Sequence, residues 1–69
     1  YSVITIQYPS VPGFVVSVSH NDMLISTNGF HIGICVDGIV YCNVHPLGLP
    51  KQQWIDDFDG LGPKMVNEV

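Results

Sequence analysis

Residues 30–44, with the sequence FHIGICVDGIVYCNV, carry the clearest structural signal in this chain. Two apolar runs rich in β-branched residues, 30–36 and 39–44, flank the dipeptide Asp37-Gly38. Asp-Gly between two such runs is typical of a two-residue hairpin turn, because both positions tolerate a positive φ. The sequence therefore predicts two antiparallel strands joined by a type I′ turn.

The register of this hairpin decides which side chains meet. A two-residue turn at Asp37-Gly38 places Gly33 opposite Cys42. Because side chains alternate between the two faces of a strand, His31 and Cys42 then become diagonal neighbours on one face. Asn43 and His45 fall on the other face. A glycine inside a strand often marks the close approach of another element, so we expect Gly33 to be packed against something.

Outward from the hairpin, alternation and turn residues divide the rest of the chain. We predict strands at 1–8, 14–18 and 23–27, a hairpin turn at Asn28-Gly29, a loop at 45–49, a helix at about 50–58 and a tail at 60–69. The predicted fold class is α+β, with an antiparallel sheet of four to five strands within residues 1–45, arranged as a β-meander, and one short C-terminal helix. Residues 1–69 are too few for more than a single domain. Trp54 and Phe58, spaced by four, are expected to pack together from the helix onto the sheet.

Charge and composition exclude several function classes. The chain has two basic residues against six acidic ones and a formal net charge of −4, so it cannot form the basic patch that nucleic-acid binding requires. No apolar run reaches the length of a membrane span, and no signal peptide is recognisable at the N-terminus. Only 12% of the residues are charged, which is low for a small domain and predicts an apolar surface covered by a protein partner or a second copy.

The two cysteines admit several interpretations. Cys35 and Cys42 could form one disulfide, or they could be small buried apolar side chains. Cys42 could instead be a nucleophile activated by His31. Together with His31 and His45 they offer zinc-ligand chemistry, but the close Cys-x-x-Cys pair of many zinc sites is absent. We therefore predict no metal and no cofactor.

Two further polar groups are expected to be solvated. His20 lies in the turn cluster Ser-His-Asn-Asp at 19–22. Asp56, Asp57 and Asp59 form a short acidic run that reads as an exposed face, with weak Ca²⁺ binding as the alternative.

A longer pattern resembles a known family. The stretch STNGFHIGI (26–34), followed by VDGIVYCN (36–43), HPLG (45–48) and Trp54, is similar to the C-terminal half of papain-fold domains at the ends of bacterial polymorphic toxins. The shared pattern is Asn-Gly-x-His, a strand, a glycine turn, an aromatic residue before Asp-Asn, a Pro-x-Gly loop and a helix with Trp. The resemblance covers residues 26 to about 58, as the His-bearing sheet half of a papain-like fold.

The resemblance implies cysteine-hydrolase chemistry of the peptidase or deamidase type. In that chemistry a cysteine on a helix attacks an acyl carbon, a strand histidine deprotonates it, and an acid or amide on the next strand orients the histidine. By this correspondence His31 is the general base. Cys42 stands where the family has the orienting Asp, and Asn43 follows it. The resemblance further implies a cytoplasmic or secreted toxin domain whose partner is an immunity protein.

Two departures from the family pattern set the expectation for activity. The family nucleophile precedes the first strand, and neither Cys35 nor Cys42 is predicted on a helix ahead of the histidine. A thiol at position 42 is also a weaker hydrogen-bond acceptor than a carboxylate. We therefore expect the isolated chain to be inactive. The alternative is a non-catalytic remnant that serves as a dimerisation or protein-interaction module.

Overall fold

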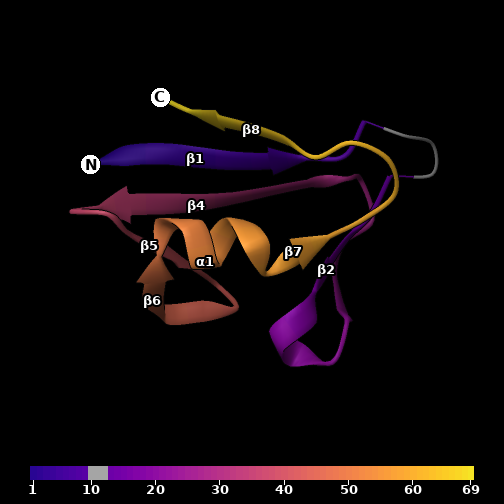
Figure 1. Cartoon of the computed structure of the whole chain (residues 1–69), viewed down its shortest axis with the longest axis horizontal. Coiled ribbons are helices and arrows are strands. Elements are labelled where there is room, and N and C mark those ends of the chain that lie inside the picture. Colours follow the sequence, from indigo (N-terminus) through magenta and orange to yellow (C-terminus); the bar gives the residue numbers. More distant parts are fainter. Residues whose placement is uncertain (10–12) are drawn as a thin grey trace.

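The computed structural model of the chain describes residues 1–9 and 13–69. Its elements are β1 (Ser2–Gln7), β2 (Val15–Ser17), the 3-10 helix η1 (Val18–His20), β3 (Met23–Ser26), β4 (Phe30–Val36), β5 (Ile39–Cys42), β6 (His45–Pro50), α1 (Lys51–Asp56), β7 (Phe58–Asp59) and β8 (Met65–Glu68). The strands form a five-stranded antiparallel sheet in the order β6-β5-β4-β1-β8 (Figure 1). The other three form a smaller sheet in the order β3-β2-β7. The predicted α+β class, an antiparallel sheet with a short helix, is confirmed.

The β4–β5 hairpin has the predicted register. Cys35 pairs with Val40 and Val36 with Ile39 across the turn. Asp37 has a φ of 52° and Gly38 a φ of 79°, as a type I′ turn requires. Local sequence alone was sufficient here because the turn chemistry and the alternation agree.

The core lies between the five-stranded sheet and α1. Along β4 every second residue is buried, and these residues face α1. Gly33 packs so closely that an added Cβ would stand 2.6 Å from Val40 Cγ1 and 2.8 Å from Trp54 Cζ2. The missing side chain therefore lets the indole of α1 lie on the strand. The other members of the buried apolar cluster are Ile4, Ile6, Tyr8, Val15, Cys35 and Phe58.

The predicted hairpin at Asn28-Gly29, and with it the predicted β-meander order, is wrong. β3 pairs with β2 in the smaller sheet, whereas β4 pairs with β1 in the larger one. Gly29 has a positive φ and Asn28 does not, so the type I′ geometry that would return the chain alongside β3 does not form. Pairing β4 with β1 instead brings their buried faces into register, with Ile6 opposite His31.

Two strands lie where a loop and a tail were expected. The predicted loop at 45–49 is part of β6, which pairs with β5, and the predicted tail contains β8, which pairs with β1. Both are edge strands of the five-stranded sheet. An edge strand tolerates proline, because only one side of its backbone bonds to a neighbour. Pro46 and Pro50 of β6 are therefore compatible with a strand.

The helix is shorter than predicted. It ends at Asp56, so Phe58 belongs to β7 and pairs with Ser17 of β2. Phe58 is nevertheless almost fully buried and packs edge-on against Trp54, with ring centroids 4.9 Å apart. Within residues 1–9 and 13–69, no helix is long and apolar enough to cross a bilayer.

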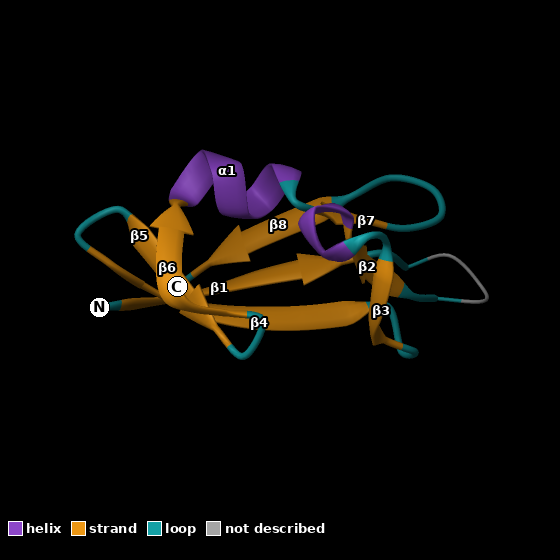
Figure 2. Cartoon of the chain, turned by 90° about the horizontal axis from the view of Figure 1, so that it is seen from below, coloured by secondary structure: helices purple, strands orange, loops and turns teal. Residues whose placement is uncertain are grey.

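The far face of the large sheet carries exposed apolar side chains. α1 lies on one face of this sheet, and no helix lies on the other face among the described residues (Figure 2). The residues of β4 that alternate with the buried ones point to that far face. Phe30, Ile32, Ile34 and Val36 are each about 40% exposed, as is Tyr41 opposite Ile34. We call these five residues the outer apolar face.

Candidate functional site

His31 lies on the buried face of β4. Its residue exposure is only 9%. The imidazole stacks near Trp54, with centroids 5.9 Å apart and planes at 23°, and contacts Phe58 at 4.8 Å. Its Nε2 is buried without a hydrogen-bond partner among the described residues. A buried, unpaired nitrogen is costly in a folded protein, so this atom calls for an explanation.

The surroundings of His31 favour the neutral imidazole. Burial lowers the pKa of His31, because the charged form loses its hydration in the aromatic pocket. The nearby imidazole of His45 lowers this pKa further through charge repulsion. At neutral pH the ring therefore keeps a free lone pair, as a proton acceptor must.

Cys42 and Asn43, the other two predicted site residues, are placed differently from each other. Cys42 shares the buried side of the hairpin, where Trp54 Nε1 donates a hydrogen bond to its sulfur at 3.3 Å. His31 and Cys42 thus contact the same indole. Asn43 is exposed in the turn between β5 and β6. No hydrogen bond joins either residue to His31 in residues 1–9 and 13–69.

Both cysteines are free thiols, so the disulfide considered from the sequence is not formed. Cys35 is buried in β4, and Cys42 ends β5. Neither lies at the start of a helix, where the amide dipoles would stabilise a thiolate.

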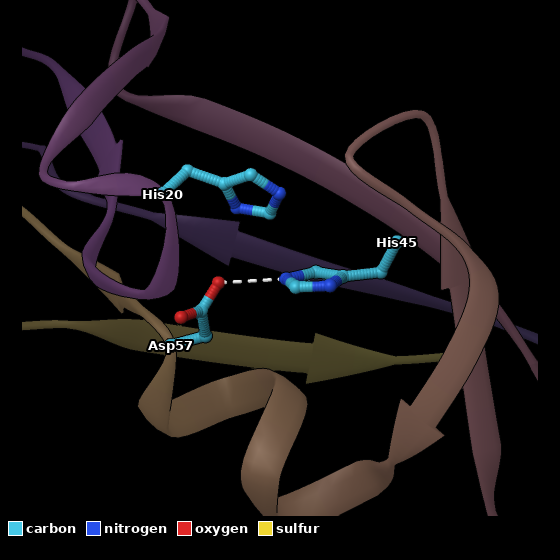
Figure 3. A group of neighbouring side chains, drawn as sticks. All are labelled: His20, His45 and Asp57. Atoms are coloured by element: carbon cyan, nitrogen blue, oxygen red, sulfur yellow. Dashed lines mark hydrogen bonds and ion pairs between the residues drawn. The ribbon is translucent and has the colours of Figure 1, made fainter.

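A second polar cluster lies beyond Phe58 from His31, where His20, His45 and Asp57 converge (Figure 3). They come from η1, from the start of β6 and from the residue after α1. His45 Nε2 lies 2.7 Å from Asp57 Oδ2. The imidazoles of His20 and His45 have centroids 5.1 Å apart. One potential ligand atom from each side chain lies within 4.8 Å of the others.

Asp57 is the best-anchored member of this cluster. The hydroxyl of Ser17 donates to Oδ2 at 2.6 Å, and the backbone N–H of Ser19 donates to Oδ1 at 2.8 Å. Burial alone would raise the pKa of Asp57, but these bonds and the one from His45 outweigh it and hold the pKa at about 2. Asp57 is therefore a carboxylate at any physiological pH.

The prediction that Asp57 is solvated is wrong, because it is only 8% exposed, whereas Asp56 and Asp59 are exposed as predicted. The sequence spacing nevertheless indicated that Asp57 is buried. Asp57 lies three residues after Trp54, and positions three apart in a helical turn share a face. The buried indole could thus have marked Asp57 as facing inward.

The prediction that His45 lies on the face opposite His31 is also wrong. Both rings contact Phe58, at 4.8 Å for His31 and 6.0 Å for His45. β5 ends at Cys42, and a turn separates it from β6. The strict alternation behind the prediction therefore does not continue to His45. His20 is exposed, as predicted, but Ser17 Oγ lies 2.8 Å from its Nδ1.

A surface pocket of about 400 Å³ adjoins Asp57. It is lined by Val18, Ser19, Leu49, Gln53, Asp56 and Asp57. Asp57 therefore borders a solvent-filled pocket on one side. On the other side, Phe58 packs near the imidazoles of both His45 and His31.

The comparisons with known proteins give one result. Residues 2–59 match the family model described as papain fold toxin 2. No curated protein and no solved structure matches the chain. The matched range covers β1 to β7, and with them His31 and the His20–His45–Asp57 cluster.

Proposed function

Because the chain belongs to the papain fold toxin 2 family, we propose that it supplies the histidine-bearing part of a papain-like cysteine hydrolase, a peptidase or deamidase. His31 is the general base. The attacking thiol comes from a cysteine outside residues 1–69, because Cys35 and Cys42 are neither on a helix nor ahead of the histidine. This chain alone is inactive.

One observation carries this proposal: the buried Nε2 of His31 has no partner in the described part of the chain. An imidazole kept neutral by burial, with an unpaired ring nitrogen, has the properties of a base awaiting a donor. In the proposed reaction the thiol proton moves to the imidazole and the thiolate attacks the acyl carbon. The imidazolium then protonates the departing amine or ammonia, and water hydrolyses the thioester.

By the family pattern, Cys42 stands where an orienting acid for His31 is expected. It contacts the same indole as His31, and its sulfur is engaged by Trp54. A thiol accepts hydrogen bonds weakly, so it would stabilise an imidazolium less than a carboxylate does. Asn43, which is exposed in the following turn, would reach His31 only if that turn moved. We therefore expect a low turnover even when a nucleophile is supplied.

The test labels the natural gene product that contains residues 1–69 with an iodoacetamide probe at pH 7. The proposal predicts one fast-reacting cysteine whose labelling slows at least tenfold in His31→Gln. Asp56→Asn, which removes an exposed carboxylate, should leave the rate unchanged. Circular dichroism establishes that the variant is folded. Labelling that does not depend on His31 contradicts the proposal.

A second candidate function is a non-catalytic dimerisation or protein-interaction module, and the outer apolar face favours it. Five neighbouring apolar side chains, each about 40% exposed, exceed the scattered exposure of ordinary surfaces. Sedimentation should then detect a dimer or complex that Ile34→Lys disrupts. Leu47→Lys, which changes an apolar residue elsewhere that is 92% exposed, is the matched control. A monomer at high concentration with no partner would exclude this function.

A further inference from the structure

We propose that His20, His45 and Asp57 form a binding site for a divalent transition metal, with Zn²⁺ as the best fit. Two imidazoles and one carboxylate are a recurrent zinc ligand set that leaves a fourth position for water. Harder cations such as Mg²⁺ and Ca²⁺ prefer oxygen ligands and would bind this set poorly. The site does not involve His31, so it stands independently of the proposed hydrolase chemistry.

The ligand atoms are already gathered. All three lie within 4.8 Å of one another, whereas Zn–N and Zn–O bonds of roughly 2.0–2.2 Å imply ligand atoms about 3.3 Å apart in a tetrahedron. The contraction required is therefore small. It falls mainly on His20, because His45 Nε2 and Asp57 Oδ2 are already 2.7 Å apart, and His20 is exposed whereas Asp57 is buried.

The surroundings orient the carboxylate as they do in metal sites. Ser17 and the Ser19 amide hold Asp57 in place, and such supporting hydrogen bonds raise the affinity of a ligating carboxylate. Both carboxylate oxygens of Asp57 already accept hydrogen bonds. The metal would therefore take the place of the His45 Nε2 proton beside Oδ2. That proton moves from Nε2 to Nδ1, which frees the Nε2 lone pair for the metal.

The positions of the three ligands give the site a structural consequence. His20 ends η1, which connects β2 and β3 of the smaller sheet, His45 begins β6 of the larger sheet, and Asp57 follows α1. A bound ion would therefore connect both sheets and the helix. In a chain of this size, where the hydrophobic core is thin, such a connection stabilises the fold by favouring the native state over the unfolded chain.

Calorimetric titration with ZnCl₂ at pH 7.5 tests the site. We expect one Zn²⁺ per chain, a rise in Tm, and Co²⁺ absorption bands typical of a four-coordinate site. His20→Ala should weaken binding at least tenfold, and His20→Cys, which keeps a zinc ligand, should restore most of it. Because His20 is exposed, neither change opens a cavity in the core, although both remove the contact with Ser17 Oγ, and circular dichroism establishes that the variants are folded.

Two controls separate this site from other zinc-binding groups. Asp56→Asn removes the neighbouring exposed carboxylate, and Cys42→Ser removes a thiol near His31; both should leave the affinity unchanged. Zinc binding that is lost in Cys42→Ser, or is unaffected by His20→Ala, overturns the proposal. So does the absence of any binding at micromolar zinc.

Discussion

Replacing Asp57 with Asn should destabilise the protein at neutral pH and have a vanishing effect in acid. Hydrogen bonds hold the pKa of this carboxyl at about 2, against an ordinary value of 3.8. At about 1.36 kcal/mol per pKa unit this difference corresponds to at most about 2.4 kcal/mol of stability. Solvent reaches the cluster through the exposed His20, so screening reduces the expected contribution to about 1–2 kcal/mol.

The sign follows from proton linkage. Because the folded state lowers the pKa of Asp57, its stabilisation is fully present above about pH 4 and is lost as the pH falls through the folded value of about 2. Urea denaturation of wild type and Asp57→Asn, in EDTA from pH 7 to pH 2, measures the difference. It should be constant down to about pH 4 and then shrink. Asp56→Asn should show no such dependence, and a difference in Asp57→Asn that stays constant to pH 2 would refute the assignment.

Three further predictions follow from the buried face of the β4–β5 hairpin. Gly33→Ala should lower the free energy of unfolding by about 1–3 kcal/mol, because the new methyl would collide with Val40 and Trp54; urea denaturation followed by Trp fluorescence measures this, and an unchanged midpoint would contradict the packing. Cys42→Asp should raise the pKa of His31, measured by NMR titration of the imidazole, since a carboxylate on the same face stabilises the imidazolium; an unchanged pKa would show that position 42 does not face His31. His31→Phe should flatten the loss of stability below pH 6.5, because burial lowers the pKa of His31 in the folded state and protons then favour the unfolded chain; a fall as steep as that of wild type would exclude His31 as its source.

The sequence was sufficient wherever local signals agreed with each other. The β4–β5 hairpin combines alternation with a turn dipeptide that requires positive φ, and its register and buried face follow from those two facts. For this reason the sequence predicts that His31, Gly33 and Cys42 lie on one side of the hairpin. The short helix with its inward-facing Trp54 was recognisable for a similar reason, from proline, apolar spacing and length.

The remaining features depend on contacts between distant segments. β8 is an exposed edge strand that pairs with β1, about 60 residues away in the sequence. Nothing within 65–68 indicates that partner. The separation of β3 from β4 depends likewise on β2 and β7 offering a second sheet. Local propensity is a weak guide in such cases, because tertiary pairing decides the outcome.

The same limitation explains why the His20–His45–Asp57 cluster was not foreseen. Its members belong to three elements, and each of them resembles an ordinary surface or turn residue when taken alone. They meet because α1 ends one turn after Trp54 enters the core and because β6 turns back along β5. A search for chemistry at fixed spacings finds motifs within one element, and this cluster is built across elements.

Phe58 links the two histidine sites of this molecule. The centroid of its ring lies 4.8 Å from that of His31 and 6.0 Å from that of His45. Positive charge on His45 lowers the pKa of His31, because like charges repel each other and little water lies between the two rings to screen them. A cation held by the cluster would act in the same direction and keep the His31 imidazole neutral. Occupancy of the metal site would therefore keep the resting base neutral but disfavour the imidazolium that forms in the proposed reaction, without any contact between the metal and the reacting groups.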